Sequence, residues 1–219
     1  MSQTERGAAM QTDSFGALMP ALSYKTAVEP IREVLRYLKD TYELDAFAAG
    51  GALRDLWHGV DVKDVDVFAS GVSRVRASAI CDALESEHPH AGAAFREVNT
   101  DYGDWSHDIH TLYDFQLPDA PAPVQLIFSY TKLTPRDVVA GFDMGFCKIA
   151  ATADEDIITP DFLLDVGRQT ATHVNPNINP DRVATRFQRL HNKYPQFRFV
   201  ADGFDARGFR IKKDIEYAL

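Results

Sequence analysis

One stretch, residues 47–68, constrains the fold of this chain more than any other. Its sequence is FAAGGALRDLWHGVDVKDVDVF. The apolar run 44–50 predicts a buried strand that ends at the pair Gly50 and Gly51. The segment 52–59 is long enough for a helix of about two turns, and Gly59 can end that helix. The stretch therefore predicts a strand, a tight glycine turn and a short helix.

Two aspartates follow this helix on the next predicted strand. Residues 61–68 alternate polar and apolar side chains, so Asp64 and Asp66 are expected to point to the same face. Two carboxylates held close together repel each other unless a cation lies between them. Hard oxygen ligands select Mg²⁺ or Mn²⁺, which can hold the attacking and leaving oxygens of a phosphoryl displacement. The alternative is a pair of exposed acids on an ordinary strand face.

The glycine turn before this strand suits a triphosphate, because the absence of a Cβ lets backbone N–H groups approach the phosphates. The order of turn, helix and Asp-x-Asp resembles the head-domain signature of class II nucleotidyltransferases, the CCA-adding enzymes and bacterial poly(A) polymerases of the DNA polymerase β superfamily. The shared pattern falls on Gly50, Gly51, Leu53, Arg54, Asp55, Gly59, Asp64 and Asp66. The resemblance implies an α+β fold, a polymerase-β-like nucleotidyltransferase head with a mixed or antiparallel sheet and flanking helices, plus a short helical neck.

The resemblance also implies roles for individual residues. Asp64 and Asp66 would be catalytic and bind the metal ions. The nucleotide-binding residues would be Gly50, Gly51, Arg54, Asp55, Asp143, Arg182 and Arg186, and Arg189 and Lys193 would contact the acceptor or its phosphates. Structural alternatives stay open: an ion pair on the helix for Arg54 and Asp55, a buried cap for Asp143, and a solvated helix face for the arginines.

Hydrophobic periodicity places further elements around this unit. Helices are expected at residues 29–40, 73–86, 134–139 and 179–194. Strands are expected at residues 95–98, 109–117 and 124–130. Ser73 and Thr134 are suited to cap the helices that follow them. We divide the chain into an N-terminal arm (residues 1–25), the nucleotidyltransferase head (26–175) and a basic neck helix with the C-terminal segment (176–219).

Two features of the resembling family are not visible in this chain. Many polymerase-β-like enzymes carry a third carboxylate on a later strand, and the polar residue of the corresponding strand here is Gln125. Either two aspartates suffice, or Asp143 or Asp114 substitutes, or the chemistry is lost. The Glu-Asp-x-x-Arg segment that selects CTP and ATP is also not visible, and the chain leaves no room for the body that holds tRNA. CCA addition to a whole tRNA is therefore not expected without a partner.

Charge is distributed unevenly along the chain. The formal net charge of −9 argues against a wholly basic nucleic-acid binder. Residues 182–213 nevertheless contain nine Lys or Arg and two acids, which suits a polyphosphate or a nucleic acid, or is simply a solvated helix face. No signal-peptide pattern begins the sequence and no apolar run approaches the ~20 residues of a membrane span. Two cysteines are consistent with a reduced, cytoplasmic protein.

Three functions fit these observations. The first is a Mg²⁺- or Mn²⁺-dependent nucleotidyltransferase that moves a nucleoside monophosphate from an NTP, ATP or CTP, to an acceptor hydroxyl and releases pyrophosphate. An RNA 3′ end is the favoured acceptor, and tRNA is one possible RNA partner. The second function is a catalytically inert nucleotide- or RNA-binding or interaction module of the same fold. The third keeps the chemistry and modifies a protein or a small molecule. No membrane partner is expected.

Overall fold

The computed structural model describes residues 23–88, 94–96, 108–117, 119–174 and 180–201. Its helices are α2 (Glu29–Tyr42), α3 (Gly51–Trp57), α4 (Arg74–Glu87), α5 (Pro135–Ala140), α6 (Pro160–Arg168) and α7 (Pro180–Lys193), with a 3₁₀ turn η2 (Gly145–Cys147). Its strands are β1 (Ala46–Ala49), β2 (Val65–Ser70), β3 (Ala94–Arg96), β4 (Ile109–Phe115), β5 (Val124–Ser129), β6 (Ile149–Ala151), β7 (Asp156–Ile158), β8 (Thr170–Thr172) and β9 (Arg198–Val200).

Seven of the described strands form one sheet in the order β3-β4-β5-β2-β1-β6-β7. The central strand β2 is antiparallel to β1 and parallel to β5, and the other neighbouring pairs in this sheet are antiparallel. Strands β8 and β9 form a separate parallel pair. The sheet is mixed and has flanking helices, so the predicted α+β fold class is confirmed.

Side-chain alternation along β2 separates the two faces of the sheet. Val65 belongs to a large apolar cluster that includes buried residues of α2 and α4. Phe68 points to the other face, where its ring stacks on Phe47 with centroids 5.5 Å apart and where α5 packs. Asp66 shares the face of Phe68, because residues two apart on a strand point the same way. The predicted site residue therefore lies on the face opposite to α2 and α4.

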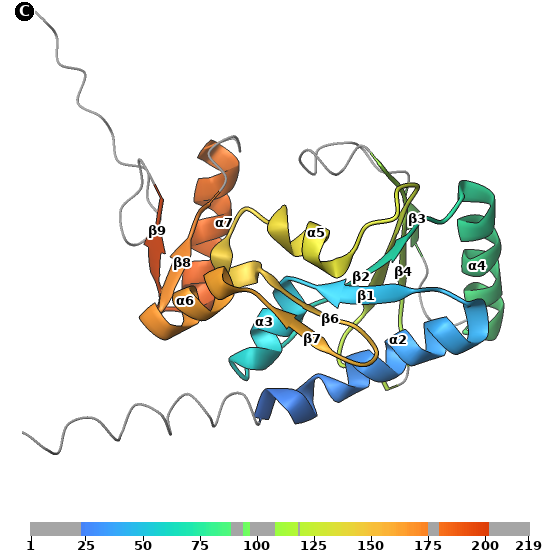
Figure 1. The fold of residues 1–219 in the computed structure, drawn as a ribbon, viewed down its shortest axis with the longest axis horizontal. Coiled ribbons are helices and arrows are strands. Elements are labelled where there is room, and N and C mark those ends of the chain that lie inside the picture. Colours follow the sequence, from blue (N-terminus) through green and yellow to red (C-terminus); the bar gives the residue numbers. More distant parts are fainter. Residues whose placement is uncertain (1–22, 89–93, 97–107, 118, 175–179, 202–219) are drawn as a thin grey trace, which may run out of the picture.

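A third apolar cluster joins α7 to the small β8–β9 sheet and to η2. The apolar stripe that periodicity predicted for the last helix is buried in it: Val183, Phe187, Leu190 and Tyr194. Figure 1 shows α6, α7, β8 and β9 grouped at one end of the large sheet. The cluster contains residues from both sides of position 175. The predicted division into residues 1–25, 26–175 and 176–219 stays a prediction.

Local signals placed most described elements correctly. Ser73 caps α4 by accepting a hydrogen bond from the Arg76 N–H at 3.3 Å, and Thr134 and Asp137 form a capping box at α5. Strands β4 and β5 fall within the segments predicted for them. The last residues of the strand predicted at 95–98, and the predicted start of the last helix at Asn179, lie outside the described residues.

One strand boundary was predicted wrongly. The strand expected at 61–68 begins at Val65, whose N–H donates to the carbonyl of Pro123 at 2.8 Å, and it continues to Ser70. Lys63 and Asp64 precede the first register pair with β5 and are exposed. The polar–apolar alternation continues through these residues, so a prediction from alternation alone began the strand too early. Asp64 therefore lies immediately before β2, and only Asp66 is held by the strand ladder itself.

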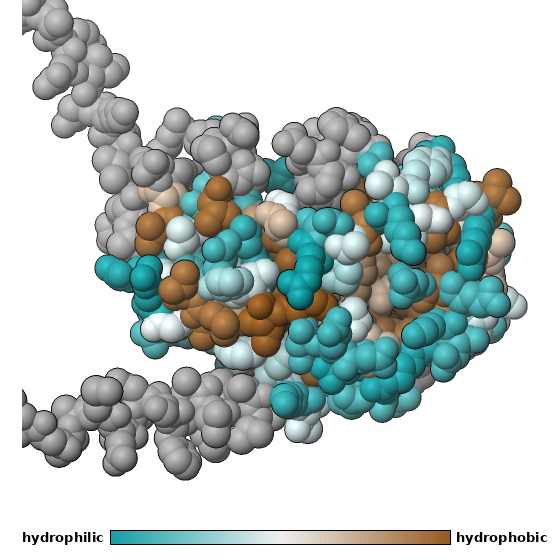
Figure 2. Space-filling view, viewed as in Figure 1, coloured by the Kyte–Doolittle hydropathy of each residue, from teal (hydrophilic) through white to brown (hydrophobic). Residues whose placement is uncertain are grey.

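The surface of the molecule is polar over much of the face shown in Figure 2. Hydrophilic residues cover the outer side of α2, whereas hydrophobic residues gather near α6. Two of the latter, Leu163 and Leu164, are about half exposed. Among the helices in the described part of the chain, none combines the length and the apolar character needed to cross a membrane.

Candidate functional site

A row of polar side chains crosses the centre of the sheet. Asp66 of β2 is the register partner of Gln125 of β5, and Gln125 is the register partner of Asp114 of β4. Register partners point to the same face of a sheet, so the three side chains lie side by side. The Gln125 amide donates a hydrogen bond to Asp114 Oδ1 at 2.7 Å. Strand β5 thus lacks the expected third carboxylate, but its Gln125 contacts the carboxylate of Asp114 on the next strand, β4.

Asp66 carries a carboxyl group that is harder to ionise than usual. Burial, and then the negative charge of Asp64, raise the pKa of Asp66 from its ordinary value of 3.8 to about 6. Arg186 and Lys63 oppose this rise in pKa with their positive charges, whereas Asp114 adds to it. A carboxylate whose charge is incompletely compensated favours a bound cation.

The donor atoms at the start of β2 fit a hard divalent cation. Asp64 is exposed and pairs with Lys63 at 3.1 Å, an exposed contact that contributes little and does not block a stronger ligand. Within the described residues, no group of three or more His, Cys, Asp or Glu side chains is arranged to hold a metal ion. Mg²⁺ needs only one or two protein carboxylates, since waters and substrate phosphates complete its shell. Asp64 and Asp66 carry oxygen donors of this kind.

The raised pKa of Asp66 predicts a specific pH dependence of stability in metal-free protein. Because the folded-state pKa of about 6 exceeds the unfolded value of 3.8, the folded protein binds this proton more tightly. The favourable contribution is present below about pH 4 and is lost as the pH rises to about 6. The measurement is the free energy of unfolding of Asp66→Asn minus that of the parent, obtained by urea unfolding in EDTA at pH 4 and at pH 7. We expect this difference to be about 1–3 kcal/mol more favourable to the variant at pH 7 than at pH 4.

The control for this measurement is Asp45→Asn, which neutralises an exposed acid outside the candidate site. In this variant the change in the free energy of unfolding between pH 4 and pH 7 is expected to stay within about 0.5 kcal/mol of the change in the parent. Adding Mg²⁺ at pH 7 is expected to stabilise the parent more than Asp66→Asn, because a ligand that binds only the folded state adds to stability. A pH dependence that is identical in the parent and Asp66→Asn would contradict the prediction.

The predicted glycine turn lies next to this row. Strand β1 pairs antiparallel with β2, with Ala48 opposite Val67, so the turn that follows β1 lies beside the start of β2. Gly50 has a φ of +87° and a ψ of −123°, a conformation that essentially only glycine adopts. A Cβ at Gly50 would lie 3.2 Å from the ring of Phe142. Both the backbone angles and the close ring explain why a glycine stands here, and Gly51 then begins α3.

We expect Gly50→Ala to lower the free energy of unfolding by about 1–3 kcal/mol, because the side chain forces a glycine-only conformation against Phe142. Chemical denaturation followed by circular dichroism measures this loss. Gly167→Ala is the matched control, because a Cβ at that helical position meets nothing within 4 Å and its φ is not positive. That variant is expected to be neutral or slightly stabilising. Equal stabilities for the two variants would contradict the strain at Gly50.

Arg186 and Asp143 are brought together by the fold. The Arg186 guanidinium donates to both carboxylate oxygens of Asp143 at 2.8 and 2.9 Å, and Asp143 is only 6% exposed. Arg186 also lies near enough to Asp66 to lower its pKa. This pair ties α7 to the segment before η2 and places positive charge next to the candidate carboxylates. The predicted contacts of the pair with a nucleotide stay predictions.

Arg54 and Asp55 are buried in a polar network that joins α3 to α7. Arg54 donates to Asp55 Oδ1 from Nε at 2.8 Å and from a terminal nitrogen at 2.6 Å. The hydroxyl of Tyr194 donates to the same oxygen, and Lys193 donates to the other one. The guanidinium carbon of Arg54 lies 5.3 Å from the ring centroid of Tyr194 and 5.4 Å from that of Phe146. With 7% and 3% exposure, Arg54 and Asp55 face protein on most sides.

Sequence reasoning did not find the part that Tyr194 plays in this network. Tyr194 was predicted only as the last member of the apolar stripe of the last helix. Its hydroxyl, directly after Lys193 in the chain, needs a hydrogen-bond partner when buried. Lys193 also donates to the carbonyl of Asp61 at 2.7 Å. Of the predicted phosphate contacts on α7, Arg182 and Arg189 are exposed. On α7 the other two basic residues of that prediction, Arg186 and Lys193, are engaged with Asp143 and Asp55 within the fold.

Comparison with known proteins identifies the fold. No family model matches the chain, and no curated protein matches it. It is similar to a CCA-adding enzyme in complex with CTP at 14% identity and a TM-score of 0.56, covering 82% of this chain and 43% of that one. It is similar to an apo tRNA-processing enzyme at 17% identity and a TM-score of 0.54, covering 79% and 44%. For a Thermotoga maritima CCA-adding enzyme complexed with tRNA the values are 13%, 0.53, 78% and 39%.

The chain therefore spans less than half the length of these solved structures. Sequence identities of 13–17% show a shared fold. The match nevertheless agrees with the motif between Gly50 and Asp66, which named the same group of enzymes from the residues alone. The chain has the head-like fold of a class II nucleotidyltransferase.

Proposed function

We propose that this protein is a nucleotidyltransferase that transfers a nucleoside monophosphate from an NTP to an acceptor hydroxyl and releases pyrophosphate. The observation that carries the proposal is the pair formed by Asp64, immediately before β2, and Asp66 on β2, beside the turn at Gly50, in a fold shared with CCA-adding enzymes. Mg²⁺ or Mn²⁺, when bound, would supply Lewis-acid polarisation of the α-phosphate. The raised pKa of Asp66 supports a site built for positive charge.

In the proposed reaction the acceptor oxygen forms a bond to the α-phosphorus while the bond to the bridging oxygen of pyrophosphate breaks. The hydroxyl proton is released to solvent. Asp64 and Asp66 would hold the cation, and the backbone at Gly50 and Gly51 would lie against the phosphates. Arg186, already close to Asp66, would add positive charge where the triphosphate is bound.

The proposed nucleotide and acceptor follow from the similar solved structures. Among the similar solved structures, one is described as a CCA-adding enzyme with CTP and another as a tRNA nucleotidyltransferase with a primer tRNA and an ATP analogue. We infer ATP or CTP as the donor and an RNA 3′ end as the favoured acceptor. The exposed Arg182 and Arg189 on α7 would contact RNA phosphates.

One observation favours a second candidate, an inert nucleotide- or RNA-binding module of the same fold. Gln125 occupies the strand position beside Asp66, and its amide is bonded to Asp114 at 2.7 Å. An amide there cannot act as a carboxylate ligand, so only two aspartates would hold the cations. The hypothesis of transfer requires that these two suffice, or that Asp114 serves from the neighbouring strand.

The deciding experiment incubates the purified protein with each α-³²P-labelled NTP, Mg²⁺ or Mn²⁺, and three acceptors: pooled short RNA, tRNA lacking its 3′ end, and the protein alone. We expect labelled RNA with ATP or CTP, none in EDTA, and release of one pyrophosphate per transfer. Label that remains on protein would indicate a protein acceptor. Metal-dependent binding of NTP without any labelled product would support the inert module.

A further inference from the structure

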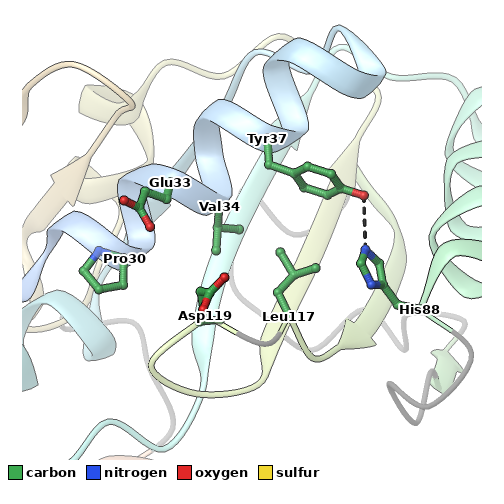
Figure 3. A pocket seen from close by; sticks show the side chains of 8 residues that line it. Pro30, Glu33, Val34, Tyr37, His88, Leu117 and Asp119 are labelled. Atoms are coloured by element: carbon green, nitrogen blue, oxygen red, sulfur yellow. Dashed lines mark hydrogen bonds between the residues drawn. The ribbon is translucent and has the colours of Figure 1, made fainter.

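A cavity of about 390 Å³ lies beside α2. It opens between α2 and the segment that follows β4, and His88 at the end of α4 closes one side (Figure 3). Helix α2 covers the face of the sheet opposite to Asp66. No residue of the candidate active site lines the cavity. Its volume falls in the range of pockets that hold small organic ligands.

The floor of the cavity is apolar. Val34 and Leu117 line it and are almost fully buried, and Ala120 and Pro30 extend the apolar surface. The ring of Tyr37 stands at the side nearest His88 (Figure 3). Such a floor suits the hydrocarbon or aromatic body of a ligand, because burial of apolar surface on both sides is favourable.

The charged groups around this floor are acidic. Glu33 and Asp119 line the cavity from its two sides, one on α2 and one on the segment after β4, and both are exposed (Figure 3). At the other end the Tyr37 hydroxyl donates to Glu87 at 2.7 Å and lies 3.2 Å from His88 Nε2. Among the described residues that line the cavity, none is Lys or Arg.

Neighbouring features reinforce the negative potential. The carbonyl end of α4, which His88 caps, carries the negative end of the helix dipole. Both arginines of α2 are engaged with acids: Arg36 pairs with Glu29 at 2.5 Å and Arg32 pairs with Asp156 at 2.8 Å. Phosphate groups and nucleotides would be repelled here, so the cavity differs in ligand class from the carboxylate site on β2.

We propose that this cavity binds a small organic cation, a protonated amine or guanidinium carried on an apolar or aromatic body. The body lies on Val34 and Leu117, and the positive group lies between Glu33 and Asp119. This inference does not depend on the proposed nucleotidyl transfer, because it uses the other face of the sheet.

The test compares three ligands that share one apolar body: phenethylammonium, 2-phenylethanol and phenylacetate. The full ¹⁵N-labelled chain is titrated at pH 7, and backbone amide shifts are followed by NMR. Phenethylammonium is expected to shift the amides of Val34, Tyr37 and Ala120 with a Kd on the order of 1 mM. It is expected to bind at least about fivefold more tightly than 2-phenylethanol, and phenylacetate is expected to bind most weakly.

The charge variant is Glu33→Gln combined with Asp119→Asn, two exposed substitutions that preserve size. It is expected to bring the affinities for amine and alcohol to within about twofold of each other, whereas Asp40→Asn, an exposed acid on α2 outside the cavity, leaves their ratio unchanged. Thermal unfolding verifies that all variants fold. Equal affinities in the parent, a preference that survives the double variant, or shifts confined to other residues would overturn the proposal. So would a lysine-rich peptide that shifts these amides where the amine does not, since the occupant would then be a protein.

Discussion

Asp66→Asn is expected to lower the rate of nucleotidyl transfer at least about a hundredfold, since even groups one step removed from a metal cost up to that much when replaced. The substitution keeps the shape of the side chain and removes the charge that would hold the cation. Asp64→Asn is expected to act in the same direction. Single-turnover transfer of labelled nucleotide to RNA at saturating Mg²⁺ measures the chemical step directly.

Loss of activity in Asp66→Asn is informative because stability is expected to move the other way. The raised pKa of Asp66 means that its charge is unfavourable in the metal-free fold, so the variant is expected to be at least as stable as the parent at pH 7. Asp45→Asn, exposed and outside the site, serves as the control and should keep full activity. Unchanged transfer by Asp66→Asn would remove β2 from the mechanism.

The sequence predicted the structure best where neighbouring residues determine the backbone conformation and the direction of the side chains. Gly50 needs a positive φ at the end of a strand, and Asp66 lies two residues from Phe68 on a strand whose alternation separates two faces. Both constraints act within a few residues, so a local pattern can express them. The same locality explains why the caps at Ser73 and Thr134 were predicted correctly.

Contacts between distant segments were beyond such a pattern. The register that sets Gln125 beside Asp66 depends on a parallel pairing across more than fifty residues, and no local signal states it. The pairing of Arg186 with Asp143 likewise depends on how α7 packs. Charge counting treated Lys193 as available for phosphate, whereas in the fold it donates to Asp55 and to a backbone carbonyl.

Asp55→Ala is expected to lower the free energy of unfolding by about 3–5 kcal/mol, the usual cost of removing one partner of a buried ion pair. Arg54 would then keep its charge at 7% exposure with its main acceptor gone, and Lys193 and Tyr194 would lose their shared partner. Urea unfolding at pH 7 measures the loss. Hydrogen exchange is expected to rise first in α7, because this network is what ties α7 to α3.

Asp61→Ala is the matched control, since Lys193 contacts only the backbone carbonyl of Asp61 and the side chain is exposed. Its stability is expected to stay within about 0.5 kcal/mol of the parent. Tyr194→Phe, which deletes one hydrogen bond to a charged acceptor, should fall between the two at about 1.5–3 kcal/mol. If Asp55→Ala kept parent stability and instead weakened NTP binding, the Arg54–Asp55 pair would be a nucleotide contact, as the family resemblance implied, rather than the connection that holds α7 against α3.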